Sequence, residues 1–304
     1  MRAIVTGATG FIGSWLTLHL LSNFDEVTVI VRNRKRLLKD IKKNPRITVI
    51  EKDISEVVTE DFKTEWKYDV CYNLAWSGVA PEHKNSLVIQ LRNIEVSTHL
   101  LEVCASIGCK KFISAGTVAE YAFCDNVIDV NNRQTPNDIY GATKTSAHYI
   151  LEVRARQLNI SFNWIVISST FGERREDNNI VTYTIKSLLK GERPQYGDLK
   201  QMWDFLYVGE AVRAIRLLGE YSKPNKVYGI GSGEYRPLRE YITIIRDIIN
   251  PNLELGIGDN PSMSKQTFSS CVNTYDLIYD TGFRSEVSFE NGVKRTVQWF
   301  IEQM

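Results

Sequence analysis

Runs of strand type alternate with helical patterns over the first 170 residues, and this alternation limits the fold more than any other feature of the chain. Parallel strands joined through helices form a sheet that is covered on both faces. The sequence therefore predicts an α/β fold with a doubly wound parallel sheet of Rossmann type. The expected strands lie at 2–6, 26–32, 46–53, 69–75, 110–116 and 162–169, and the clearest helices at 11–23, 86–108 and 138–158.

The rhythm becomes irregular after residue 170. A strand at 203–208, a helix at 210–221 and a strand at 226–231 are expected to return to the sheet. Residues 1–170 with 203–231 would then form the dinucleotide-binding Rossmann domain, and residues 171–202 with 232–304 a smaller C-terminal substrate-binding lobe. Ligands of such sheets bind beyond the carboxyl ends of the strands, where the lobe would lie.

Bulk composition narrows the class of protein. The formal net charge of +1 gives no reason to expect nucleic acid or an anionic membrane as a partner. No apolar run reaches transmembrane length, and a strand pattern starts at once, which predicts no signal peptide. The five cysteines form no C-x-x-C and the four histidines lie far apart, so neither disulfides nor a metal site are expected. These features together predict a reduced, cytoplasmic protein.

Three glycines stand between the first strand and the first helix. The stretch "VTGATGFIG" places them at Gly7, Gly10 and Gly13. Glycine allows a tight turn there and a close approach of the backbone to a pyrophosphate, which binds at the helix N-terminus. In this context the motif predicts a dinucleotide site.

The end of the second strand indicates which dinucleotide binds. NAD sites usually place an acid there for the ribose hydroxyls, whereas NADP sites place arginine for the 2′-phosphate. Here the strand ends with Val31 and Arg32, with Arg34 close behind. We therefore expect NADP(H), with NAD(H) as the alternative. Asp53, at the end of the third strand, is expected to accept from the adenine amino group.

A tyrosine precedes a lysine by four residues in "TPNDIYGATK". On a helix, Tyr140 and Lys144 share one face. An ammonium beside a phenol favours the phenolate, so the pKa of Tyr140 would fall and the phenol would serve as a proton donor or acceptor near neutral pH. Such pairs are also common on helix surfaces, so this segment alone leaves their role open.

Taken together, these motifs resemble the extended short-chain dehydrogenases/reductases, and more narrowly the nucleotide-sugar group of the NAD-dependent epimerase/dehydratase family. The resemblance covers nearly the whole chain: "NLAWSG" matches a strand ending His-Leu-Ala-Ala, and "SAGTVAEYA" matches a Ser-Ser-x-x-x-Tyr-Gly segment. "DNNIV" resembles an Asn-Leu-Ile-Pro segment, and "WDFLYVGEAVRAI" resembles Arg-Asp-Phe-x-x-Val-x-Asp.

The resemblance implies a set of site residues. The catalytic group would be Thr117, Tyr140 and Lys144. The cofactor would contact Gly7, Thr9, Gly10, Phe11, Ile12, Arg32, Arg34, Asp53, Ile54, Leu74, Ala75, Trp76, Tyr140, Lys144 and Ile167. The substrate would contact Ser77, Thr117, Tyr121, Asn179, Gln201 and Trp203, and no metal is implied.

Two departures from the family pattern bear on the reaction. The family's 4,6-dehydratases carry Asp-Glu after the threonine, whereas Val118 and Ala119 stand here and cannot move a proton. We therefore expect no dehydratase activity. Trp203 replaces an arginine that often contacts the substrate diphosphate, which leaves the sugar and its nucleotide open.

The resulting hypothesis is an NADPH-dependent reductase of a 4-keto (deoxy) nucleotide sugar, in which Tyr140 donates the proton. An NAD-dependent nucleotide-sugar 4-epimerase is the alternative, and a non-catalytic NADP(H)-binding sensor is a third reading, disfavoured by the intact Thr117, Tyr140 and Lys144. The resemblance also implies a homodimer that pairs helices 86–107 and 138–158 with their copies in a four-helix bundle.

Overall fold

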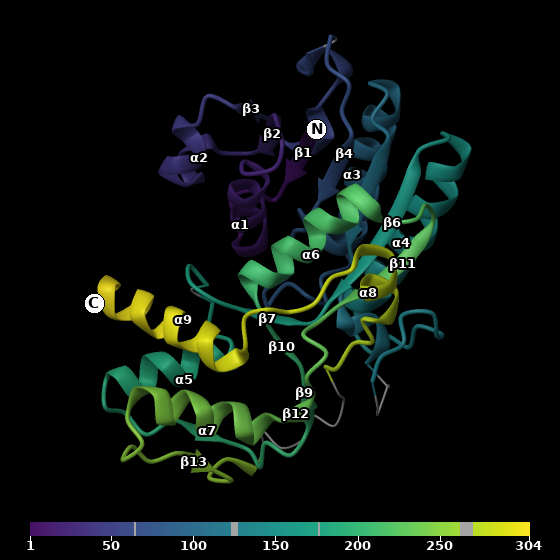
Figure 1. Ribbon diagram of the computed structural model, residues 1–304. Helices are drawn as coiled ribbons and strands as arrows, with labels where there is room; N and C mark the ends of the chain where they lie inside the picture. Colours follow the sequence, from purple (N-terminus) through teal and green to yellow (C-terminus); the bar gives the residue numbers. More distant parts are fainter. Residues whose placement is uncertain (64, 123–126, 176, 262–269) are drawn as a thin grey trace.

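Seven parallel strands form the central sheet of the computed structural model, which describes residues 1–63, 65–122, 127–175, 177–261 and 270–304 (Figure 1). The strand order is β11-β6-β5-β4-β1-β2-β3. This order confirms the predicted doubly wound Rossmann sheet, with the switch in strand order between β1 and β4. The strands are β1 (Arg2–Thr6), β2 (Glu26–Val31), β3 (Ile47–Glu51), β4 (Val70–Asn73), β5 (Lys111–Ala115), β6 (Ser161–Ile167) and β11 (Lys226–Ile230).

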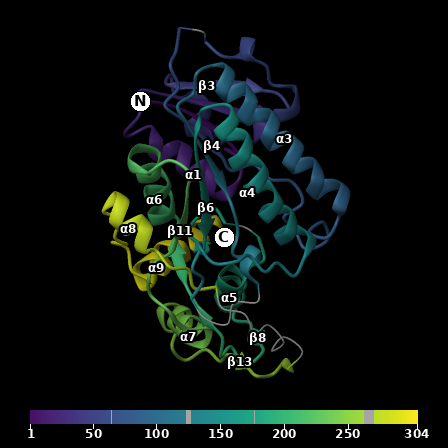
Figure 2. The ribbon, with the colours of Figure 1, turned by 90° about the vertical axis from the view of Figure 1, so that its right-hand side faces the viewer.

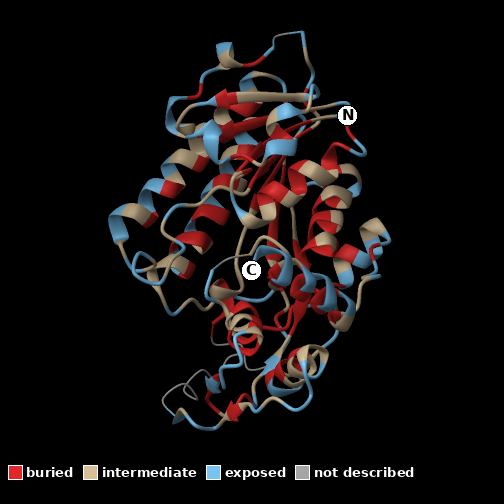
Figure 3. Cartoon of the chain, turned by 90° about the vertical axis from the view of Figure 1, so that its left-hand side faces the viewer, coloured by how far each residue is buried: buried red, intermediate tan, exposed pale blue. Residues whose placement is uncertain are grey.

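Helices cover both faces of this sheet. On one face α1 (Phe11–Leu20) packs beside α6 (Val208–Tyr221), and on the other α3 (Leu87–Ser106) packs beside α4 (Ile139–Gln157) (Figure 2). Alternate strand residues supply the two cores: Ala3 and Val5 belong to the cluster under α1 and α6, and Ile4 to the cluster under α3 and α4. Figure 3 shows the buried residues along the sheet and the inner faces of the helices. The short helix α2 (Lys39–Lys43) lies beside β3.

A smaller lobe extends from the carboxyl ends of the strands. An aromatic cluster joins its parts: the ring centroids of Phe289 lie 4.9 Å from Phe171 and 4.6 Å from Tyr241. Its helices are α5 (Ile180–Leu189), α7 (Leu238–Ile249) and α9 (Phe289–Gln303), and its short strands are β7 (Ser169–Phe171), β8 (Gln195–Tyr196), β9 (Met202–Trp203), β10 (Phe205–Tyr207), β12 (Arg236–Pro237) and β13 (Gly256–Ile257).

Two elements lie elsewhere than the sequence suggests. The stretch 203–208 does not join the main sheet, because β10 pairs only with β7 in a separate parallel pair. Helix α8 (Tyr275–Thr281) packs on α6 and β11 rather than in the lobe. It is held there by Lys226, whose ammonium lies 2.7 Å from Asp276 and 2.8 Å from Asp280.

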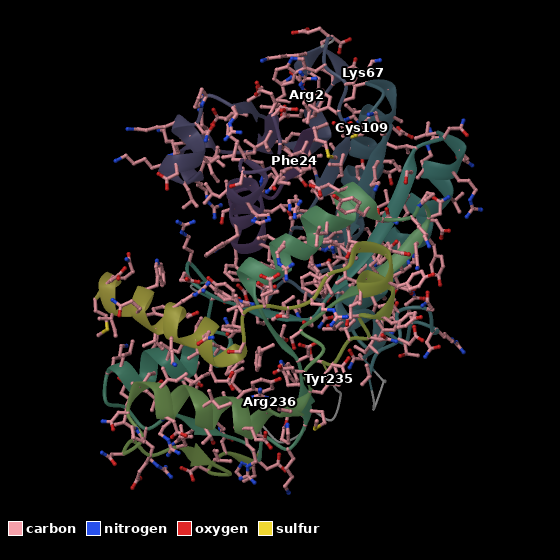
Figure 4. All side chains as sticks on the ribbon, in the orientation of Figure 1. Arg2, Phe24, Lys67, Cys109, Tyr235 and Arg236 are labelled. Carbon is pink, nitrogen blue, oxygen red and sulfur yellow. The ribbon has the colours of Figure 1, made fainter. Side chains whose placement is uncertain are left out.

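The cysteines of the described residues form no disulfide and are buried. Cys104 is hydrogen-bonded to both Cys71 and Cys109, and burial raises the pKa of Cys71 and Cys104, so the thiols are protonated. Cys109 lies near the amino ends of the strands, with Arg2 and Lys67, whereas Tyr235 and Arg236 lie at the opposite end (Figure 4). Cys124 is outside the described residues.

No helix within the described ranges is long and apolar enough to cross a membrane.

Candidate functional site

The turn between β1 and α1 requires its glycines. Gly7 has φ +75°, and a Cβ there would lie 3.0 Å from the carbonyl carbon of Leu74. A Cβ on Gly13 would lie 2.1 Å from the carbonyl oxygen of Gly7, so the helix can pack on the turn only without a side chain. No acidic residue occupies the first turn of α1, which leaves the helix N-terminus free to attract an anion. This cradle fits the pyrophosphate of a dinucleotide.

Thr6 joins this turn to the end of β4. Its hydroxyl donates to Asn73 Oδ1 at 2.9 Å and accepts from the backbone N–H groups of Leu74 and Ala75, both at 3.1 Å. Two positions expected to contact the cofactor, Leu74 and Ala75, therefore lie directly beside the glycine turn.

The region around the end of β2 has mixed charge. Arg32 is exposed after β2, and Arg34 begins a short 3₁₀ turn, η1 (Arg34–Arg36). A hydrogen bond from Ser55, aided by the nearby charge of Arg32, lowers the pKa of Asp53. Sequence reasoning missed Glu51. It pairs in register with Val31, and its carboxylate accepts from Arg34 N at 2.9 Å, so an acid does lie beside the end of β2.

Thr117, Tyr140 and Lys144 come together at the ends of β5 and α4. Thr117 precedes the 3₁₀ turn η4 (Val118–Tyr121), which follows β5. Asp138 caps α4 by accepting from Gly141 N at 2.6 Å, so the predicted helix starts just before Tyr140. The Tyr140 phenol is hydrogen-bonded to the Thr117 side chain.

The charge relation between Tyr140 and Lys144 differs from the expectation. Burial raises the pKa of Tyr140 to about 12, although the bond to Thr117 opposes the rise. Burial also lowers the pKa of Lys144, and the charge of Glu120 opposes this fall. The predicted fall in the Tyr140 pKa is therefore wrong, because desolvation dominates and the charges of Glu120 and Asp138 add to the rise.

Lys144 lies between aromatic rings. Its Nζ donates to the carbonyl oxygen of Ala115 at 2.5 Å, lies 3.7 Å from the ring centroid of Trp76 and 5.7 Å from that of Trp164. Trp76 also packs edge-on against Tyr140, at 6.5 Å between ring centroids. The loop after β4 thus forms one wall of the candidate site.

That wall is fixed by two polar side chains of α3. Gln90 Oε1 accepts from Trp76 Nε1 at 2.8 Å. Asn93 accepts from Ser77 N at 2.8 Å and donates to Ser77 O at 3.0 Å. Trp76 and Ser77 are therefore held in place before any ligand binds.

Several of the expected substrate residues have partners within the protein. Tyr121 is buried, and its hydroxyl donates to Val130 O at 2.8 Å. Asn179 caps α5 by accepting from Val181 N and Thr182 N. Gln201 accepts from Leu238 N through its backbone oxygen. The indole N–H of Trp203 is buried without a partner among the described residues.

The remaining predicted cofactor residues follow the same strand ends. Thr9 lies in the glycine turn, Phe11 and Ile12 begin α1, Ile54 follows Asp53, and Ile167 ends β6.

Comparison with known proteins identifies the family. A family model described as the NAD dependent epimerase/dehydratase family matches residues 3–231. The chain therefore belongs to this family, within the extended short-chain dehydrogenases/reductases.

Its relatives are distant and include more than one activity. A dTDP-glucose 4,6-dehydratase of Streptomyces antibioticus is 23% identical over 312 residues, covering 99% of this chain and 92% of that protein. A putative UDP-glucose 4-epimerase of Methanocaldococcus jannaschii is 24% identical over 307 residues, covering 97% of both. A UDP-glucuronic acid 4-epimerase of Bacillus cereus, solved with UDP-glucuronic acid and NAD, has a TM-score of 0.86 at 21% identity and full coverage of both chains.

Proposed function

We propose that the chain is a nucleotide-sugar 4-epimerase, which oxidises and re-reduces one carbon of the sugar with a nicotinamide dinucleotide. The observation that carries this proposal is the grouping of Thr117, Tyr140 and Lys144 at the strand ends, beside a glycine cradle that fits a pyrophosphate. The epimerases among its relatives and structural neighbours favour it over the one-way reduction that the basic end of β2 suggests.

The proposed roles follow from the position of each polar group. A nicotinamide dinucleotide held at the glycine turn would supply the hydride acceptor and donor for the sugar carbon. The Tyr140 oxygen takes the hydroxyl proton when the carbon is oxidised and gives it back on reduction. Thr117, hydrogen-bonded to Tyr140, orients the same oxygen. Lys144 supplies positive charge behind the phenol.

The residues after Thr117 argue against loss of water as a further step. Dehydration needs a group that protonates the leaving hydroxyl, and Val118 and Ala119 have none. The next acid, Glu120, is fully buried and bonded to Trp164, so it does not replace them. The proposed reaction therefore consists of oxidation and reduction of the sugar carbon without loss of water.

One experiment separates epimerase from reductase. The purified protein is incubated with UDP-sugars without added cofactor, and the sugars are followed by NMR. An epimerase gives an equilibrium mixture of two sugars with its bound dinucleotide unchanged. A reductase acts only on a keto sugar and consumes reduced dinucleotide in proportion to product. Inactivity of the protein in both assays would contradict the proposal.

The NADPH-dependent reductase is retained as a second candidate because of Arg32. Its guanidinium is exposed at the end of β2, where it could meet a 2′-phosphate. Glu51 has the opposite effect, since its carboxylate suits ribose hydroxyls and repels phosphate. Titration of the wild type, Arg32→Ala and Glu51→Gln with NADH and with NADPH measures these two effects. Arg32→Ala should weaken the binding of NADPH but not of NADH, and Glu51→Gln should strengthen the binding of NADPH.

A further inference from the structure

Glu120 has an unusual position beside the catalytic group. It has no exposed surface, and its carboxylate accepts from Thr117 N at 2.7 Å and from Trp164 Nε1 at 3.1 and 3.2 Å. Gly116 makes room for these contacts, since a Cβ there would lie 2.3 Å from Trp164 Nε1 and 2.6 Å from Glu120 Oε1. A buried carboxylate is costly unless a positive charge balances it.

Lys144 is the cation available to balance it. The lysine is only 4% exposed, and its direct contacts are neutral: the Ala115 carbonyl and the Trp76 and Trp164 rings. Trp164 touches both groups, with its indole N–H on the Glu120 carboxylate and its ring facing the Lys144 ammonium. Glu120 is the carboxylate whose charge acts on Lys144, and Lys144 is the cation whose charge acts on Glu120.

We propose that Glu120 is a positioning residue that keeps Lys144 charged and directed at the active site, and that the two buried groups act as one unit. The proposal rests on the proposed redox function of Tyr140 and Lys144. It explains how a lysine that is buried among tryptophans remains a cation. Glu120 acts through Lys144, since it has no exposed surface with which to contact substrate or cofactor.

The other ionisable groups that face the pair lie on α4 and η4. On α4, Tyr140 senses the Glu120 charge as well as that of Asp138, and His148 stacks on Trp164 at 5.2 Å between ring centroids; in η4 the neighbouring Tyr121 senses Glu120. The sheet contributes Ala115 and Trp164, which do not titrate. Removal of the Glu120 charge should therefore act mainly on Lys144, by lowering its pKa.

The test follows the protonation of Lys144 directly. Lysine side chains are isotope-labelled, and their Cε resonances are titrated by NMR, with Lys144 assigned by its loss in Lys144→Met. In Glu120→Gln, which keeps the size and acceptor oxygen of the side chain, Lys144 should lose its proton about one pH unit or more lower than in the wild type. The control is Glu152→Gln, which removes a carboxylate two turns further along α4 and should leave Lys144 unchanged.

Turnover gives a second reading. If charged Lys144 is needed, the alkaline limb of the pH–rate profile moves to lower pH in Glu120→Gln and stays in place in Glu152→Gln, whereas a merely structural role would lower the rate without moving the limb. Absence of any sugar turnover in the wild type would overturn the proposed function, while the NMR titration would still decide the role of Glu120.

Equal titration of Lys144 in the wild type and Glu120→Gln would overturn the proposal. If Glu120→Gln does not fold, the double variant Glu120→Gln with Lys144→Met decides. The proposal expects it to fold, because no lone buried cation remains. Its failure to fold would mean that Glu120 serves the structure independently of Lys144, and would overturn the proposal as well.

Discussion

At the scale of single residues, the proposed chemistry depends on the hydroxyl of Tyr140. Tyr140→Phe keeps the ring that packs on Trp76 and removes only the proton carrier, so turnover should fall by about a hundredfold or more while dinucleotide binding is unchanged. Thr117→Ala should lose about 3 kcal/mol of transition-state stabilisation, since one hydrogen bond to the reacting oxygen is gone. Steady-state kinetics and fluorescence titration of the cofactor measure both effects.

Tyr121 provides the matched control. Its hydroxyl is bonded to Val130 O, so Tyr121→Phe should lower stability by about 1 kcal/mol and leave turnover intact. Loss of turnover in Tyr121→Phe would indicate that Tyr121 contacts the substrate. Retained turnover in Tyr140→Phe would show that Tyr140 is not the proton carrier.

Another residue-scale consequence concerns the buried acid of the lobe. Asp204 is fully buried, and burial raises its pKa to about 7 although Ser232 donates to it from its backbone and hydroxyl. Because the folded pKa lies above the unfolded one, the unfolded state releases this proton first as the pH rises. Ionisation of Asp204 therefore lowers the free energy of unfolding progressively as the pH rises to the folded pKa. Above that pKa the loss of stability is complete and stays constant.

Asp204→Asn removes this titration. The free energy of unfolding of the variant minus that of the wild type should increase by about 3 kcal/mol from pH 5 to pH 8, because about two pH units separate pH 5 from the folded pKa. Urea unfolding at the two pH values measures the difference. Asp247→Asn, at an exposed site on α7, is the control and should show no such trend. Absence of this trend would mean that Asp204 is ionised in the folded protein throughout this pH range.

At the scale of elements, the β1–α1 turn is the part most intolerant of change. In Gly13→Ala the new Cβ would meet the Gly7 carbonyl, which is backbone and cannot move unless the turn opens. The variant should lose both stability and dinucleotide binding. Gly108→Ala is the control: Gly108 has φ +71° and open space around its Cβ position, so it should lose about 1–2 kcal/mol of stability and keep binding. Tight binding by Gly13→Ala would place the pyrophosphate elsewhere.

Elements with a strong local pattern could be predicted from sequence. The helices expected at 86–108 and 138–158 end within two residues of α3 (Leu87–Ser106) and α4 (Ile139–Gln157), because apolar spacing, caps and glycines are local signals. Strand pairing is not local. The apolar run 203–208 indicated a strand, but nothing in it distinguishes pairing with β7 from pairing with the main sheet.

The candidate site was predictable only in part, for a similar reason. Motif spacing brought Thr117, Tyr140 and Lys144 together, whereas their charge states depend on burial, which spacing does not reveal. Glu120 did leave a signal: Thr117 and Glu120 form a capping box, visible as a threonine followed three residues later by a glutamate. That spacing predicts the turn, but it does not predict that the Glu120 carboxylate and the Lys144 ammonium balance each other's charge.

At the scale of the whole molecule, one outer face has more exposed apolar side chains than a monomer needs. Leu87, Val88 and Leu91 at the start of α3 are 54%, 80% and 50% exposed. On the adjacent α4, Tyr149, Ile150 and Val153 are 52%, 44% and 50% exposed. Apolar surfaces shared by two neighbouring helices are typical of protein interfaces.

This face leads to the prediction of a homodimer. A two-fold axis would bring α3 and α4 against their copies in a four-helix bundle, as in the commonest class of oligomer. Sedimentation velocity at micromolar concentration should therefore show a dimer. Leu91→Glu combined with Ile150→Glu should give a folded monomer, because each would bury an unpaired carboxylate in the interface. Ile301→Glu, at a half-exposed site on α9, is the matched control and should stay dimeric. A monomeric wild type would contradict the prediction of a dimer. A dimer that persists in the double variant would show that the subunits contact each other through another surface.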